Sequence, residues 1–202
     1  MKRLIRRIIS IPKRLFIYLY YRSKFKSFPI SARIVKPLHI DGAKRISIGE
    51  KVYVAYKTWL AAMPLTGYSD CCLDIQDGAI IGHFNHIYAT RKIVIEKDVL
   101  TADRVYISDN LHGYENVDMP IHKQPIIQNG DGVVIGEGSW LGENVCIIGA
   151  SLGKHCVVGA NSVVTKDVPD YSVVVGSPAR IIKRYDFNTK SWRKTMPNGE
   201  FV

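Results

Sequence analysis

Residues 108–132 carry the side chains whose types could do chemistry. This stretch, SDNLHGYENVDMPIHKQPIIQNGDG, combines acids, two histidines and a tyrosine, and it interrupts a chain whose apolar residues otherwise recur every six positions. An imidazole can take a proton from a hydroxyl group near neutral pH, which makes His112 a candidate general base. Asp109 is a candidate to orient that imidazole, with a backbone carbonyl of the segment as the alternative. We interpret the segment as a functional loop, and a solvated surface excursion is the other interpretation.

The scaffold around this segment repeats in steps of six residues. Five triples share the step: Ile48, Val54 and Leu60; Ile75, Ile81 and Ile87; Ile95, Thr101 and Ile107; Ile135, Leu141 and Ile147; Leu152, Val158 and Val164. Fourteen of these fifteen residues are aliphatic, and in ten cases the next residue is Gly, Ala or Glu. A helix repeats every 3.6 residues and an ordinary strand every two, so neither fits. The step predicts a short strand and a corner every six residues, and three such strands close one coil of a triangular parallel β-helix.

Extra residues enter the repeat after Leu60, Ile87 and Ile107, so we expect the insertions to share one edge of the prism. The pattern predicts three parts. Residues 1–32 form a basic amphipathic helical arm, residues 33–176 form the β-helix with its loop at 108–132, and residues 177–202 form a C-terminal helix and tail. The helix is expected over Arg180–Tyr185, following the turns marked by Pro169 and Pro178.

The net charge of +10 belongs to the arm rather than to the whole chain. Nine of the 28 basic residues fall within residues 2–26, which contain no acid. The rest of the chain contains the other 19 basic residues and all 18 acids. A nearly neutral body argues against a nucleic-acid partner. Within the arm, Leu4, Ile8, Ile11 and Leu15 share one helical face. Peripheral contact with the inner face of the cytoplasmic membrane and capping of the open end of the β-helix are both consistent with this pattern.

The cysteines and the N-terminus favour a cytoplasmic protein. Cys71, Cys72, Cys146 and Cys156 show no metal-ligand spacing, which suits a reducing compartment. No secretory signal is evident, because Pro12 and the basic pair after it interrupt the apolar run. The apolar run at residues 15–21 is far shorter than the roughly 20 residues that span a bilayer. No cysteine or serine is placed to form a covalent acyl-enzyme.

Four motifs resemble the hexapeptide-repeat acetyltransferases, and within them the lipopolysaccharide and O-antigen O-acetyltransferases. They are VLTADRVYISDNLHG (99–113), IGEGSWLGENVCI (135–147), VVGANSVVTKDVP (157–169) and VGSPARIIKRY (175–185). The resemblance covers roughly residues 40–185. It implies a left-handed β-helix, homotrimers with active sites in the clefts between subunits, and acetyl-CoA as the donor of an acetyl group. The acceptor implied is a sugar hydroxyl of a surface polysaccharide or its precursor, acetylated directly in a ternary complex.

The resemblance also implies roles for single residues. His112 matches the catalytic histidine, and Asn85 matches an asparagine that holds the acceptor hydroxyl. Trp140 matches a tryptophan that lines the cleft, and Ala160, Thr165, Lys166 and Arg180 match positions that line the coenzyme site. Apart from the resemblance, Lys183 is a further cation near the end of the stack that could bind the coenzyme's phosphates, and Gly142 and Glu143 are expected at the corner near the thioester. An oxyanion would accept a hydrogen bond from a backbone N–H at the Trp140–Glu143 corner. Two positions depart from relatives: Asn110 stands where many carry a second histidine, and Glu143 where many carry a small residue.

Two other functions are compatible with this scaffold. The γ-class carbonic anhydrases bind zinc with three histidines across a subunit cleft, and His83 and His86 with His112 or His122 could imitate that set. We nevertheless expect no metal, because the spacing differs and the coenzyme motifs favour transfer. A catalytically inactive β-helix that serves as a binding module is the second alternative.

Overall fold

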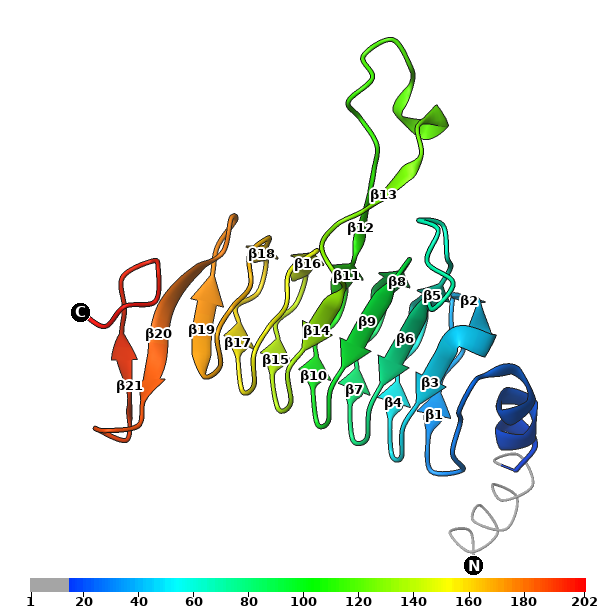
Figure 1. Cartoon of the computed structure of the whole chain (residues 1–202). Helices are drawn as coiled ribbons and strands as arrows, with labels where there is room; N and C mark the ends of the chain where they lie inside the picture. The colour runs from blue at the N-terminus through cyan, green and yellow to red at the C-terminus, as the bar shows by residue number, and fades with distance from the viewer. Residues whose placement is uncertain (1–14) are drawn as a thin grey trace, which may run out of the picture.

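The computed structural model describes residues 15–202, and these wind into a triangular prism of parallel strands (Figure 1). The strands form three faces, named A, B and C in the order in which a coil passes through them. The last coils reach face A only through single β-bridges at Leu152 and Val168. Face A holds β3 (Ile46–Ile48), β6 (Cys72–Ile75), β9 (Lys92–Ile95) and β14 (Val133–Ile135). Face B holds β1 (Arg33–Ile34), β4 (Tyr53–Val54), β7 (Ile80–Ile81), β10 (Leu100–Thr101), β15 (Trp140–Leu141), β17 (Val157–Val158) and β19 (Ser172–Val175). Face C holds β2 (His39–Asp41), β5 (Trp59–Ala62), β8 (His86–Ala89), β11 (Tyr106–Ser108), β16 (Cys146–Ile148) and β18 (Val163–Val164). The β-helix predicted from the sequence is confirmed.

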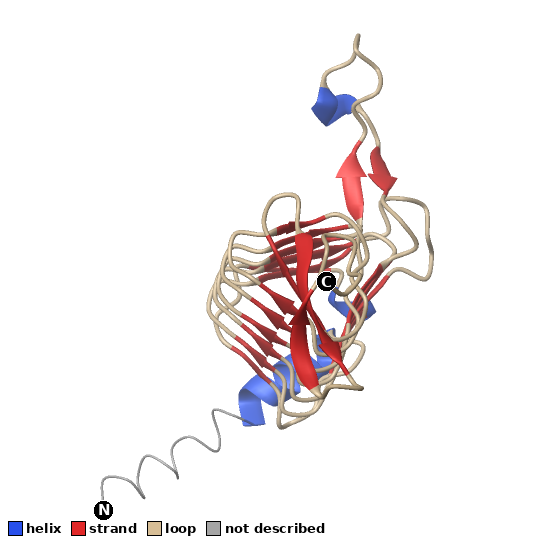
Figure 2. Cartoon of the chain, turned by 90° about the vertical axis from the view of Figure 1, so that its left-hand side faces the viewer, coloured by secondary structure: helices blue, strands red, loops and turns tan. Residues whose placement is uncertain are grey.

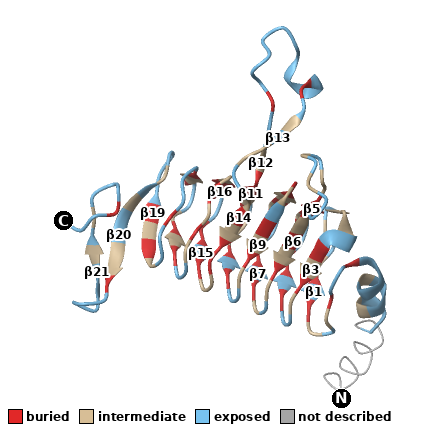
Figure 3. Ribbon diagram, viewed as in Figure 1, coloured by how far each residue is buried: buried red, intermediate tan, exposed pale blue. Residues whose placement is uncertain are grey.

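The six-residue step fills the interior of the prism. All fifteen residues of the five triples are at most 2% exposed, and they form the buried column visible in Figure 3. Equivalent residues lie in register in successive coils, as Leu60, Ile87 and Ile107 do on face C. The corners must be small because neighbouring coils approach closely there. A Cβ added to Gly82 would lie 2.2 Å from the carbonyl oxygen of Ala102 in the next coil.

The insertions share one edge, as expected. Residues 63–71, 90–91 and 109–132 all connect face C to face A, and we call this the C–A edge. The B–C edge carries only short corners, such as residues 82–85 and 102–105. Extra residues are tolerated at one edge because the strands on either side keep their register. The short 3₁₀ turn η1 (Ala43–Arg45) precedes β3.

The described part of the arm covers the first coil. Residues 15–24 are helical, and Tyr18 and Tyr21 pack against the core. Phe25 and Phe28 are buried, and the backbone of Ser27 accepts a hydrogen bond of 2.9 Å from the Ile48 N–H. The helix still leaves Phe16 71% exposed. The expected helical face of Leu4, Ile8 and Ile11 lies outside the described residues.

The expected C-terminal helix at Arg180–Tyr185 is wrong. Residues Arg180–Asp186 form strand β20, which pairs antiparallel with β19 and with β21 (Ser191–Lys194). A parallel stack ends in a strand edge whose N–H and C=O groups need partners, and a hairpin supplies them where a helix cannot. Figure 2 shows this hairpin lying across the C-terminal end of the prism.

Candidate active site

The interrupting segment forms a hairpin that projects away from the prism (Figures 1 and 2). Strand β12 (Asn110–His112) pairs antiparallel with β13 (Ile126–Gln128), and the 3₁₀ turn η2 (Ile121–Lys123) lies near its tip. Gln124 closes the tip, because its side chain bonds to the backbones of Asn116 and Met119. The hairpin is therefore an ordered element rather than a loose excursion.

His112 is exposed at the end of β12, opposite Ile126. Among residues 15–202 no group forms a hydrogen bond with its imidazole. A base that must approach a substrate from outside needs such an accessible ring. The hairpin backbone fixes the position of His112.

Asp109 does not contact His112, contrary to the expected orienting role. Its buried carboxylate accepts hydrogen bonds from the N–H groups of Thr90, Arg91 and Lys92 at 2.7–2.8 Å and from the Thr90 hydroxyl at 3.0 Å. Gln128 adds a bond from its amide to the Asp109 carbonyl oxygen at 2.7 Å. The chain turns outward at this point, and Asp109 fastens the base of the hairpin to the neighbouring coil.

We expect Asp109→Ala to lower the free energy of unfolding by about 3 kcal/mol, because buried backbone donors lose a charged acceptor. Urea unfolding followed by circular dichroism measures this change. Asp118→Ala, at the exposed hairpin tip, is the matched control and should change stability by less than about 0.5 kcal/mol. Equal stability of the Asp109 variant and the wild type would show that Asp109 does not fasten the hairpin.

Three of the expected coenzyme residues line one pocket at the C-terminal end of the C–A edge. Thr165, Lys166 and Arg180 border a pocket of about 430 Å³ between the last coil and the chain near Asn198. Two cations beside a hydroxyl group suit the phosphates of a nucleotide coenzyme. Lys183 does not border this pocket and is exposed on β20. The pocket lies on the same edge as the hairpin, two coils farther along.

The other expected coenzyme residues lie elsewhere, on face B and the B–C edge. Trp140 is 47% exposed on the outer side of β15, and Gly142 and Glu143 form the corner that follows it. Ala160 occupies the equivalent corner of the next coil, where an added Cβ on Gly142 would lie 2.7 Å from its nitrogen. The N–H groups of Trp140 and Gly142 bond to the next coil. The N–H of Glu143 has no acceptor within residues 15–202 and remains the candidate oxyanion donor at this corner.

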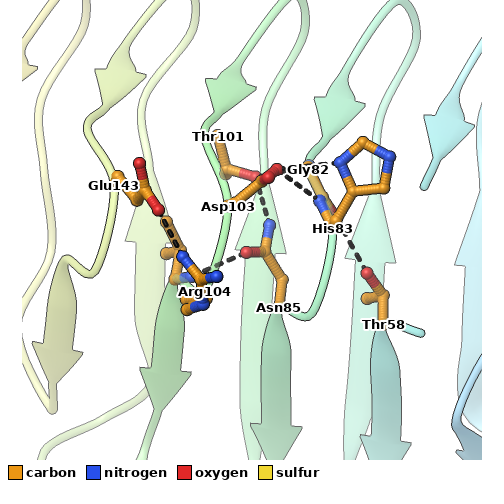
Figure 4. A network of polar contacts seen from close by, with 9 residues as sticks. Thr58, Gly82, His83, Asn85, Thr101, Asp103, Arg104 and Glu143 are labelled. Carbon is orange, nitrogen blue, oxygen red and sulfur yellow. Dashed lines mark hydrogen bonds and ion pairs between the residues drawn. The ribbon is translucent and has the colours of Figure 1, made fainter. Parts of the chain in front are cut away.

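Asn85 is not placed to hold an acceptor. It is 1% exposed, its amide nitrogen donates to the Thr101 hydroxyl, and its oxygen accepts from the Val105 N–H at 2.6 Å (Figure 4). A buried amide whose nitrogen and oxygen are both engaged stabilises a corner, and at 1% exposure it is not accessible to a substrate. The sequence motif aligned this residue, but its side chain turns into the prism.

The histidines considered for zinc are not brought together. His83 pairs with Asp103 on the B–C edge, while His86 stacks on Trp59 on face C at a ring separation of 4.3 Å. Burial lowers the pKa of His86. No group of three or more His, Cys, Asp or Glu side chains in the described chain could hold a metal ion. The absence of zinc stays a prediction, which elemental analysis of the purified protein would check.

The four cysteines are free thiols in the structure. Burial raises the pKa of all four, that of Cys71 to about 11. A thiol that stays protonated at neutral pH is a poor nucleophile. This supports direct transfer over a covalent acyl-enzyme on cysteine.

The pairing of His83 with Asp103 was missed at the level of sequence. The two residues are 20 positions apart, which is the same separation as between Ile81 and Thr101 in consecutive coils. Counting coil lengths could therefore have placed His83 directly against Asp103. The sequence pattern alone presents His83 as a candidate zinc ligand.

Comparison with known proteins agrees with the fold. A family model, "Hexapeptide repeat of succinyl-transferase", matches residues 132–166. The chain is 33% identical over 171 residues to WbbJ of Escherichia coli (strain K12), described as a lipopolysaccharide biosynthesis O-acetyl transferase, covering 81% of this chain and 85% of that protein.

Two solved structures share the fold. AntD, an N-acyltransferase from Bacillus cereus in complex with dTDP and 3-hydroxybutyryl-CoA, superposes with a TM-score of 0.68 at 19% identity over 83% of this chain and 87% of that chain. A maltose O-acetyltransferase from Clostridium difficile 630 superposes with a TM-score of 0.52 at 23% identity over 82% and 73%.

Proposed function

Because this chain belongs to the hexapeptide-repeat acetyltransferases, which are left-handed β-helices, we propose that it moves an acetyl group from acetyl-CoA to a sugar hydroxyl. The acceptor is a surface polysaccharide or its precursor. The observation that carries the proposal is the exposed imidazole of His112 on a fastened hairpin, on the same edge as the cationic pocket of Lys166 and Arg180.

His112 acts as the general base in this proposal. Its imidazole removes the proton of the acceptor hydroxyl as the oxygen attacks the thioester carbonyl carbon. A new C–O bond forms, the tetrahedral oxyanion accepts a hydrogen bond from the Glu143 N–H, and the C–S bond then breaks. The proton passes from His112 to the leaving thiolate of coenzyme A. The reaction balances without metal or redox chemistry.

The site requires more than one copy of the chain. His112 leaves the prism at the C–A edge, while Trp140 and Glu143 lie on face B and the B–C edge, on another side of the same prism. A neighbouring copy would bring these two sets together across the cleft. We therefore propose a homotrimer in which the hairpin of one chain meets the B–C edge of the next.

Exposed apolar side chains support this assembly. On the hairpin Val117 is 92% exposed, and Tyr114, Met119 and Ile121 are also exposed. On face B a row of exposed apolar residues runs in register through consecutive strands: Tyr53, Ile80, Leu100 and Trp140. Exposed apolar side chains on a hairpin that projects into solvent favour a partner surface that covers them.

We propose that the enzyme lies in the cytoplasm and that its arm holds it at the inner face of the cytoplasmic membrane. No helix within residues 15–202 is long and apolar enough to cross a bilayer. The helix instead exposes Leu15, Phe16 and Leu19, and the first acid of the whole chain is Asp41. Exposed apolar side chains in a segment that has cations and no acid favour the surface of an anionic bilayer. The arm can serve there while its other side covers the first coil.

Full-length protein is expected to co-sediment with vesicles of phosphatidylglycerol and phosphatidylcholine but not with phosphatidylcholine alone. Each cation near an anionic surface contributes about 1 kcal/mol, and salt screens that attraction. Replacing Phe16 and Leu19 by serine should lower binding at least about tenfold, because apolar burial is lost. Replacing the equally exposed Phe187 and Met196 by serine is the control. If vesicle binding changed neither with salt nor with these helix substitutions, the arm would serve only as a cap of the first coil.

The proposed function is tested with purified protein, acetyl-CoA and a panel of hexoses, deoxyhexoses and N-acetylhexosamines. Release of free thiol and a gain of one acetyl mass on the sugar are the readouts. In the parent cell, the surface polysaccharide should lose that acetyl mass when the protein is removed. Coenzyme A binding without acetyl transfer to any sugar, in the panel or in the cell, would favour the inactive binding module.

A further inference from the structure

The B–C edge holds a second histidine in a defined orientation. The carboxylate oxygen Oδ1 of Asp103 accepts a hydrogen bond of 2.8 Å from the His83 backbone N–H and lies 3.0 Å from its ring nitrogen Nδ1 (Figure 4). Gly82 makes this approach possible, since an added Cβ there would lie 2.9 Å from the same oxygen. The ring is thus held by a neighbouring coil, while the His83 side chain remains 49% exposed.

The protonation of the pair follows from these contacts. The backbone N–H of His83 is the main cause that lowers the pKa of the Asp103 carboxyl, which is therefore ionised and can only accept hydrogen bonds. Nδ1 of His83 must then carry the proton. In the neutral ring Nε2 is left as an acceptor. No described residue donates to Nε2, so it is available to a hydroxyl group from outside.

Aromatic rings lie beside this imidazole. Phe84, which follows it, is 47% exposed and meets the ring of Tyr56 edge-on at 6.0 Å. The guanidinium of Arg104 lies 5.9 Å from the Phe84 ring and pairs with Glu143. An exposed ring beside an acceptor nitrogen and a guanidinium offers what a sugar requires, namely an apolar surface for its C–H face and polar groups for its hydroxyls.

The height of this cluster along the prism matches that of the hairpin. Asp103 lies between β10 and β11, and the hairpin leaves the chain at the end of β11, so both belong to one coil. A ring closed by rotation about an axis parallel to the prisms keeps every residue at the same height in every copy. The hairpin of one copy is therefore level with the His83–Asp103 pair of the next. The corners of Glu143 and Ala160 lie one and two coils toward the C-terminal end, on the coenzyme side.

We propose that His83, oriented by Asp103, and the ring of Phe84 form the subsite that holds the acceptor sugar for His112 of a neighbouring copy. Nε2 of His83 accepts a hydrogen bond from a hydroxyl of the sugar, and Phe84 covers one face of the pyranose ring. Asp103 acts through His83 as a positioning residue. The inference rests on the proposed function and assigns the residues that bind the acceptor sugar. The buried side chain of Asn85 does not fill that role.

The experiment measures steady-state kinetics of His83→Gln, Phe84→Ala and Asp103→Asn with the best sugar of the panel. KM for the sugar should rise about 10–100-fold for the first two and less for Asp103→Asn, with kcat and KM for acetyl-CoA within about threefold of wild type, because binding common to ground state and transition state is lost. His39→Gln and Phe187→Ala are the matched controls and should leave all constants unchanged, because His39 is exposed two coils toward the N-terminal end and Phe187 is exposed after β20. Thermal melting verifies that each variant is folded.

Direct binding separates this inference from the proposed function. Saturation-transfer NMR should detect the sugar on the wild type and on His112→Ala, but not on His83→Gln or Phe84→Ala. An unchanged sugar KM and an unchanged NMR signal in folded His83→Gln would overturn the subsite while wild-type turnover upholds the transferase. A His83-dependent NMR signal in a protein that never transfers acetyl would overturn the transferase and uphold the subsite. A lower kcat of His83→Gln with an unchanged KM for the sugar would also overturn the subsite, because that result would make His83 a general base.

Discussion

His112→Ala is expected to lower the turnover of acetyl transfer about 10²–10⁴-fold while coenzyme A binding stays within about twofold of wild type. The hairpin carries its own hydrogen bonds through Asp109, Gln124 and Gln128, none of which involves the imidazole. Removing the ring should therefore leave the scaffold and the distant cationic pocket intact. Only proton removal from the acceptor hydroxyl is lost.

Thiol release at saturating acetyl-CoA measures turnover, and calorimetry with coenzyme A measures binding. His122→Ala is the matched control, because His122 lies on the same hairpin in η2 and is equally exposed. It should keep turnover within about threefold of wild type. Wild-type turnover by His112→Ala with its best sugar would remove His112 from the mechanism, and equal losses in both variants would indicate a role for the hairpin surface instead.

Co-expression of two inactive variants is expected to restore about a third of wild-type activity in purified mixed trimers. His112→Ala removes the base from the C–A edge, and Ala160→Trp places an indole at an exposed corner of the B–C edge, on the coenzyme side. If each site joins the C–A edge of one copy to the B–C edge of the next, a site is intact when the first copy carries Ala160→Trp and the second His112→Ala. Random mixing makes about one site in four intact, and purification of mixed trimers alone raises this share to about one site in three.

Differently tagged chains, purified through both tags, provide the mixed oligomers for this assay. Co-expression of His112→Ala with His112→Asn is the control and should restore nothing, because both lesions fall on the same edge. Activity near zero in the first mixture, with mixed oligomers present, would place both residues in one chain's own site. The composite cleft would then be wrong, whereas the family assignment would stand.

The hairpin shows how far the residues of the site could be predicted. Its polar composition and its place in the only long break of the repeat pointed to His112, which the structure leaves accessible. The same composition suggested that Asp109 orients the imidazole, yet three backbone N–H groups of the neighbouring coil occupy its carboxylate. Those donors are 17–19 residues away. A local motif could not reveal them, because they meet Asp109 only when coils stack.

The predicted helix at Arg180–Tyr185 was wrong for a related reason. The run RIIKRY has no strict alternation and no six-residue step, so its local pattern does not distinguish a helix from a strand. The open edge of β19 makes the difference, since it supplies backbone partners that only another strand can use.

The sequence by itself determined the β-helix, and the phase chosen for the five triples predicted the edge that carries the insertions. The sequence did not fix that phase, because Ile93 also fits the six-residue step after Ile87. Both predictions follow from a local property, the inward aliphatic residue and small corner in every six positions. Tertiary structure alone decided that Asn85 turns inward, that Asp103 fastens His83, and that the expected coenzyme residues divide between two edges. Polar contacts depend on which corners lie one coil apart, and that depends on the length of every insertion between them. The six-residue hydrophobic pattern can therefore be read from neighbouring residues in the sequence, whereas the contacts of the site form only between residues of stacked coils.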